Sequence, residues 1–68
     1  MRLVKRSFSL AGHRTSVALE PEFWDALFEL AERRSQPLSA LVAAVDADRT
    51  PDQPLASSLR IFALQSRP

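Results

Sequence analysis

The sequence has no cysteine, no tyrosine, one glycine (Gly12) and one histidine (His13) among its 68 residues. Without cysteine the chain forms neither a disulfide nor a thiolate metal site. A single glycine excludes the glycine-rich loops that hold phosphates in many nucleotide-binding enzymes. A single histidine with no acidic cluster around it provides neither a metal site nor a base for a nucleophile. We therefore expect no metal, no cofactor, no catalytic residue and no enzymatic activity.

The sequence also has no apolar run long enough to cross a membrane. Arg2, Lys5 and Arg6 interrupt the apolar residues at the N-terminus too closely for a secretion signal. We expect a cytoplasmic protein that does not bind a membrane.

The short length predicts one domain, spanning residues 1–68, with a small core. A chain of this size buries only about 60% of the surface that its unfolded form exposes. Small domains usually gain stability from disulfides, metals or oligomerisation. Because disulfides and metal sites are excluded, we predict that the domain gains stability by association with a second copy.

The net charge is only +1, but it is unevenly distributed. Residues 1–19 carry four basic residues and no acidic one, whereas residues 20–68 carry five basic and eight acidic residues. A basic N-terminal segment on an acidic body is typical of a localised anion-binding surface. The alternative is a solvated tail that only aids solubility.

Two segments near the N-terminus have the alternation of β-strands. In residues 13–19, Thr15, Val17 and Leu19 share one face, and Arg14, Ser16 and Ala18 share the other. Residues 3–10 are a second candidate strand, which a turn at residues 11–12 would join to the first. In the alternative, residues 1–10 form an arm, and residues 13–19 pair with the same strand of a second chain. The sequence leaves both open.

Helical periodicity predicts helices over residues 21–34, 38–47 and 54–65. Pro21 suits the first helical position, with Glu20 before it. The apolar stripe of residues 21–34 is too wide for one neighbouring element, which indicates burial between protomers. The predicted dimer core consists of Val17, Leu19, Phe23, Trp24, Leu27, Leu41, Val42 and Val45.

The polar face of residues 13–19 suggests contact with nucleic acid. Arginine bonds both acceptors of guanine in the major groove, serine bonds several base edges, and alanine touches only the thymine methyl group. Lys5 and Arg6 would neutralise phosphates, and free N–H groups at the start of the second helix can hold another. The predicted DNA-binding residues are Lys5, Arg6, Arg14, Ser16, Ala18, Leu38 and Ser39.

The order of strand, helix, tight turn and helix resembles the ribbon–helix–helix superfamily of small dimeric DNA-binding proteins (Arc/MetJ-like). Residues 12–24, 38–42 and 55–62 look like one bacterial branch, usually described only as ribbon–helix–helix domain proteins. The resemblance covers residues 4–65. It implies an α+β, mostly helical homodimer with an antiparallel β-ribbon, to which this chain adds an N-terminal strand and a third, C-terminal helix.

The resemblance also implies roles for particular residues. Bases would be read by Arg14, Ser16 and Ala18, and a phosphate would be held at residues 37–39. Two positions depart from the superfamily pattern: Ala18 offers no hydrogen bond, and Pro37 stands where a capping serine or threonine is common. We expect a small transcriptional regulator or antitoxin-type repressor that binds double-stranded DNA. The alternative is a dimeric protein-interaction module that binds another protein and has weak or no DNA binding.

Overall fold

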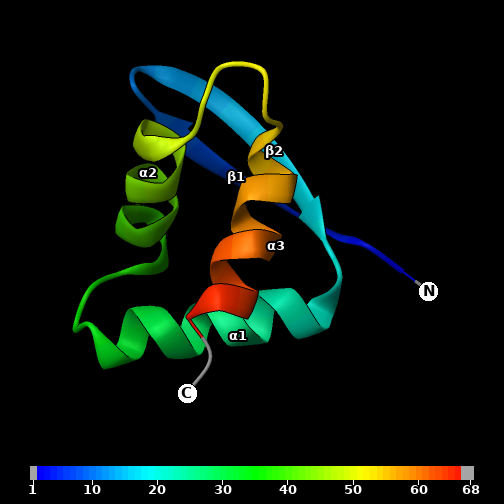
Figure 1. Cartoon of the computed structure of the whole chain (residues 1–68), viewed down its shortest axis with the longest axis vertical. Helices are drawn as coiled ribbons and strands as arrows, with labels where there is room; N and C mark the ends of the chain where they lie inside the picture. Colours follow the sequence, from blue (N-terminus) through cyan, green and yellow to red (C-terminus); the bar gives the residue numbers. More distant parts are fainter. Residues whose placement is uncertain (1, 67–68) are drawn as a thin grey trace.

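The fold is a two-stranded antiparallel ribbon followed by three helices, which confirms the predicted α+β class (Figure 1). A computed structural model describes residues 2–66, so Met1 and residues 67–68 lie outside the described part. The elements are β1 (Val4–Leu10), β2 (His13–Leu19), α1 (Pro21–Arg33), α2 (Leu38–Asp48) and α3 (Leu55–Gln65).

The two strands form a hairpin within one chain. They pair in antiparallel register, with Val4 opposite Leu19 and Leu10 opposite His13. Ala11 and Gly12 connect them with positive φ angles of 50° and 81°, as in the type I′ turn whose twist matches that of the flanking strands. Residues 4–10 are therefore a strand and not a loose arm. The partner of β2 comes from the same chain, so this strand by itself gives no reason to expect a dimer.

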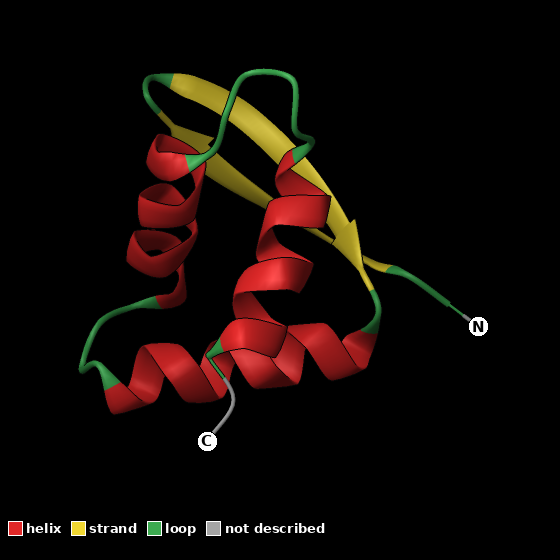
Figure 2. Cartoon of the chain, viewed as in Figure 1, coloured by secondary structure: helices red, strands yellow, loops and turns green. Residues whose placement is uncertain are grey.

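The core lies between the inner face of the ribbon and the helices (Figure 2). Helix α2 packs against β1, and α3 packs against β2. The residues predicted for a dimer core are covered within the single chain, and only Phe23 among them is half-buried. The wide apolar stripe of α1 is thus explained by contacts with α2, α3 and the start of β1 rather than by a second protomer. The buried apolar residues are Phe8, Leu10, Val17, Leu19, Trp24, Leu27, Leu30, Ala31, Leu41, Val42, Val45, Leu55, Leu59 and Ala63.

Helix α3 completes this core. Leu55, Leu59 and Ala63 recur every four residues on its inner face, and all three are buried. Leu59 is fully buried, and burial of a leucine side chain contributes about 1.5–3 kcal/mol. The helix contacts α1, α2 and β2, and so covers a side of the core that two helices alone would leave open.

The start of α1 is bonded to both β1 and α3. Trp24 Nε1 donates to the Val4 carbonyl oxygen at 2.8 Å. The Glu20 carboxylate accepts two hydrogen bonds from Arg60, from Nε at 3.0 Å and from Nη2 at 3.2 Å. A hydrogen bond from the backbone N–H of Glu20 lowers the pKa of its carboxyl group, and Arg60 lowers that pKa further, although burial opposes them. These bonds fix the position of α1 below the ribbon.

The end of α1 turns sharply into α2. Ser35 adopts a positive φ of 53°, and its N–H donates to the Glu32 carbonyl oxygen at 3.0 Å. The N–H of Gln36 donates to the Ala31 carbonyl oxygen at 3.0 Å. This pair of bonds is the Schellman motif that ends many helices. Here a serine occupies the position that usually holds glycine.

Candidate nucleic-acid interface

One face of the ribbon is polar and uncovered; we call it the outer ribbon face. The register places Lys5 opposite Ala18, Ser7 opposite Ser16, and Ser9 opposite Arg14. These six side chains share a face because side chains alternate along each strand. All are exposed except Ala18, which is half-buried. The helices pack against the opposite face, so the outer ribbon face stays open (Figure 1).

The two charges on this face are both positive and lie at opposite ends. Lys5 lies near the start of β1, and Arg14 lies on β2 near the turn. They are about four residues apart along the ribbon, or roughly 14 Å, which matches about four base-pair steps of 3.4 Å. None of the ion pairs among residues 2–66 involves either of them. Both cations are therefore available to an anionic ligand.

A pair of hydroxyl groups lies between these cations. Ser7 Oγ and Ser16 Oγ are 3.1 Å apart and share one hydrogen bond. One O–H and several lone pairs remain free, so the pair can both donate to and accept from a ligand. Ser7 and Ser9 are absent from the residues that the sequence predicted. Alternation puts Ser7 and Ser9 on the same face of β1 as Lys5. The pairing of β1 with β2 then puts them beside Ser16 and Arg14.

Arg6 does not lie beside Lys5 on the outer ribbon face, although the sequence predicted that both would neutralise phosphates. It lies on the opposite face of β1, and its guanidinium carbon is 5.6 Å from the centre of the Trp24 ring and 4.9 Å from that of Phe28. Cations in this position are attracted to the aromatic faces. Arg6 thus covers part of Phe28, which is still 43% exposed on α1.

The start of α2 is also separate from the outer ribbon face. Pro37 precedes the helix, and no side chain caps it. The N–H groups of Ala40 and Leu41 bond to the Pro37 carbonyl oxygen, which leaves those of Leu38 and Ser39 at the open end of the helix. Figure 1 shows α2 starting beside the end of α1 and running toward the ribbon. The predicted phosphate site at Leu38 and Ser39 therefore lies at the end of α2 that is far from the ribbon.

These features define a class of protein: a small α+β domain that presents a two-stranded ribbon with an open, basic outer face. The sequence matches the family described as "Ribbon-helix-helix domain" over residues 3–66, and the chain belongs to this family. The resemblance seen in the sequence is thereby confirmed. Comparison with curated proteins and with solved structures gives no match. Within residues 2–66, no helix has both the length and the apolar character needed to cross a bilayer.

Proposed function

We propose that this protein is a sequence-specific DNA-binding protein, a small bacterial transcriptional regulator of the repressor or antitoxin type. It acts in the cytoplasm as a homodimer, without cofactor or catalysis, and inserts the outer ribbon face into the major groove of double-stranded DNA. The observation that carries this proposal is the outer ribbon face itself, which holds two unpaired cations, three serines and no acid.

The dimensions of the ribbon support the proposal. The major groove is about 12 Å wide and admits a two-stranded β-ribbon. Ribbon–helix–helix domains are typically found in DNA-binding regulators, which agrees with the family of this chain. In the proposed complex Arg14 bonds guanine, Ser7 and Ser16 bond base edges, and Ala18 contacts a thymine methyl group.

The phosphate contacts are assigned differently from the sequence prediction. Lys5 binds a phosphate, because it lies near the end of the outer ribbon face, at the start of β1. Arg6 lies on the other face of β1, and it contributes to the general positive charge rather than to groove contacts. Leu38 and Ser39 are left out of the proposed interface because the first turn of α2 lies far from the ribbon.

Selection of bound duplexes from random DNA, followed by binding measurements on the selected sequence, tests the proposal. Arg14→Ala should reduce discrimination against a changed guanine by about 1–3 kcal/mol. Lys5→Ala should weaken binding to all sequences and lower the slope of log affinity against log salt by about 1.

Arg33→Ala is the matched control, because Arg33 is exposed on α1 and paired with Glu29 away from the ribbon. It should leave sequence preference unchanged. If the protein retards no duplex DNA at low ionic strength, the proposal is wrong.

A second candidate function is a dimeric protein-interaction module with weak or no DNA binding. It is favoured by the apolar surface of α3, where Ile61 and Leu64 are 42% and 55% exposed. In that case Arg14→Ala should change no measured interaction, whereas substitution of Ile61 should.

A further inference from the structure

The two strands of the ribbon carry the same residue pattern. On the outer ribbon face of each strand, a cation is followed by a serine and then by a small residue: Lys5, Ser7 and Ser9 on β1, and Arg14, Ser16 and Ala18 on β2. Each of these residues on β1 corresponds to the residue nine positions later on β2. The same offset relates the buried residues of the inner face, Phe8 to Val17 and Leu10 to Leu19.

The pairing of the strands turns this repeat into an approximate two-fold symmetry. Ser7 lies opposite Ser16, which is its own equivalent, and the two Oγ atoms are 3.1 Å apart. A half-turn about an axis through this pair brings each strand onto the other, so that Lys5 takes the place of Arg14. A ribbon built from two identical chains has this symmetry in full. In the hairpin of a single chain, the two halves are free to differ.

The two halves differ most in their cations. Lys5 stands on one half and Arg14 at the equivalent position on the other. The planar fork of arginine matches two acceptors at once, whereas the ammonium group of lysine is a compact point charge. We infer that the ribbon of one chain reads a short DNA element in one direction, and that the difference between Lys5 and Arg14 sets this direction. The inference rests on the proposed function.

The two directions of binding differ in which cation meets the guanine. In one direction Arg14 bonds both acceptors of the guanine, and Lys5 meets a phosphate at the other end. In the reverse direction Lys5 meets the guanine, and the bidentate contact is lost. A good bidentate contact changes affinity by about tenfold or more, so the first direction prevails. The recognised element then contains one guanine of this kind and is not a palindrome.

A second difference between the halves acts in the same sense. Ala18 lies opposite Lys5, and Ser9 lies opposite Arg14. Alanine contacts only a thymine methyl group, whereas serine bonds to base edges. A half-turn of the ribbon exchanges these two contacts as well as the two cations. Both differences therefore distinguish one direction from the other.

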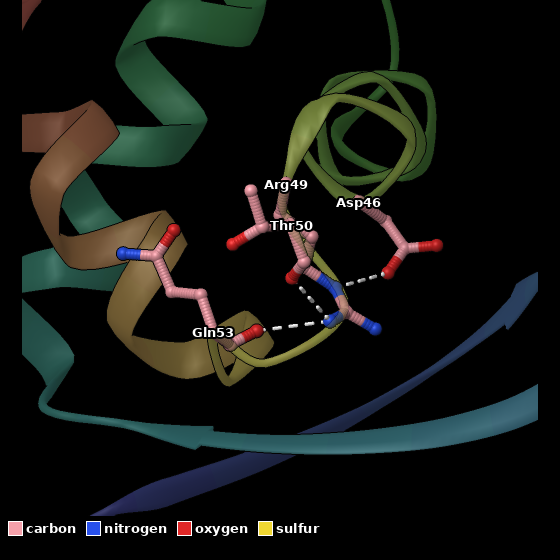
Figure 3. A network of polar contacts seen from close by, with 4 residues as sticks. All are labelled: Asp46, Arg49, Thr50 and Gln53. Carbon is pink, nitrogen blue, oxygen red and sulfur yellow. Dashed lines mark hydrogen bonds and ion pairs between the residues drawn. The ribbon is translucent and has the colours of Figure 1, made fainter.

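The arginines of the helical part do not compete with Arg14. Three of the four arginines within residues 20–66 form ion pairs with carboxylates. Figure 3 shows one of them: Arg49 donates from Nε to Asp46 at 2.8 Å and from Nη1 to the Gln53 carbonyl oxygen at 2.9 Å. The fourth, Arg34, lies over an aromatic ring of α3. The direction is therefore set by the side chains of the ribbon itself.

Selection of bound duplexes from random DNA gives the first test. The wild-type protein should select an element with one guanine at the Arg14 end. Lys5→Arg makes the two cations identical, so it should select a second guanine on the opposite DNA strand, about four base-pair steps from the first. Affinity for this symmetric element should rise about tenfold, because a second bidentate contact is added.

Directed cleavage of DNA gives the second test. The chain has no cysteine, so Leu3→Cys, at an exposed position just before β1, can carry an iron chelate that cleaves the nearest DNA. On a duplex with one copy of the element, cleavage should fall on one side of the guanine. Exchange of the two cations, Lys5→Arg together with Arg14→Lys, should move the cleavage to the other side.

Arg33→Lys in the labelled protein is the matched control, because it makes the same exchange on α1, where Arg33 is exposed and paired with Glu29. It should change neither the selected element nor the side that is cleaved. Equal cleavage on both sides of the guanine, or an element that Lys5→Arg leaves unchanged, would overturn the inference while DNA binding stands. Failure to bind any duplex would overturn the proposed function and the inference together.

Discussion

The outer ribbon face and the groove between α2 and α3, which we call the α2–α3 groove, are different kinds of surface on one small molecule. The first is polar and carries charge of one sign, in Lys5 and Arg14. The second is lined by both apolar and polar side chains and carries charges of both signs, in Arg34, Arg49 and Asp48. A surface with one sign of charge repels its own copy and attracts an anion. A surface that carries both signs lacks this preference for an anion, so the two surfaces suit different ligands.

Substitution of Trp24 should have the largest effect, because this residue lies in the core that supports both surfaces. Trp24→Ala removes the bond to the Val4 carbonyl oxygen and the contact with Phe8, whose ring centre is 6.0 Å away. The expected loss of unfolding free energy is about 3–5 kcal/mol, enough to unfold much of a domain this small. Urea denaturation followed by circular dichroism measures it.

Trp24→Phe is the informative companion, because it keeps most of the apolar area and removes only the N–H group. It should cost less than the alanine variant. A Trp24→Ala protein as stable as the wild type would show that the ribbon does not depend on α1.

The ribbon alone can be weakened at its turn. Gly12 has a φ of 81°, and a Cβ added there would meet nothing within 4 Å. Gly12→Ala should therefore cost about 1–2 kcal/mol through backbone strain alone. Amide hydrogen exchange should show faster opening of β1 and β2, while the amides of α2 and α3 change little.

The matched variant is Ala11→Gly, since Ala11 already has a positive φ of 50°. Glycine at this position should relieve the backbone strain of the positive φ angle. This gain should offset part of the conformational entropy that glycine loses on folding. If Gly12→Ala changed the amides of α2 as much as those of the ribbon, the two surfaces would not be separable.

The contact between the start of α1 and α3 can be weakened more gently through pH. The pKa of Glu20 is lowered in the folded protein, so the unfolded chain takes up this proton first as the pH falls. The stability due to the carboxylate is present at neutral pH and is lost as the pH drops below about 4.3, the ordinary value of a glutamate. Urea denaturation at pH 7 and at pH 3 should show that Glu20→Gln differs less from wild type at the lower pH.

Glu22→Gln serves as the control for this pH series, because Glu22 is exposed on the first turn of α1 and forms no ion pair among residues 2–66. A difference between Glu20→Gln and wild type that is equal at both pH values would exclude a contribution from the ionised carboxylate.

The parts of the fold that sequence predicted are those set by local periodicity. Alternation placed Val17 and Leu19 on the inner face, and Pro21 marked the start of α1. The sequence did not decide which strand pairs with β2, because residues 11–12 are a weak turn signal. Ala11 has a positive φ angle, which alanine rarely adopts. The burial of Trp24 was predicted, but its partner was not, since Val4 lies 20 residues away along the chain.

The candidate site was predicted in part for the same reason. Arg14, Ser16 and Ala18 share a face by alternation, which is local. Ser7 and Ser9 join them only through the register of the hairpin. The contact of Arg6 with Phe28 was not predicted, because it depends on where α1 packs. The open start of α2 was located correctly, but its distance from the ribbon is a property of the tertiary fold.

The hairpin has a consequence for how the protein responds to its own abundance. In a protein whose ribbon needs one strand from each of two chains, folding is bimolecular, and dilution unfolds the ribbon. Here both strands belong to one chain and are joined by a two-residue turn, so the ribbon forms in a unimolecular reaction. A cell that holds only a few copies still holds folded protein. Under the proposed function, changes in copy number then alter how many ribbons meet the same stretch of DNA, not whether a ribbon exists.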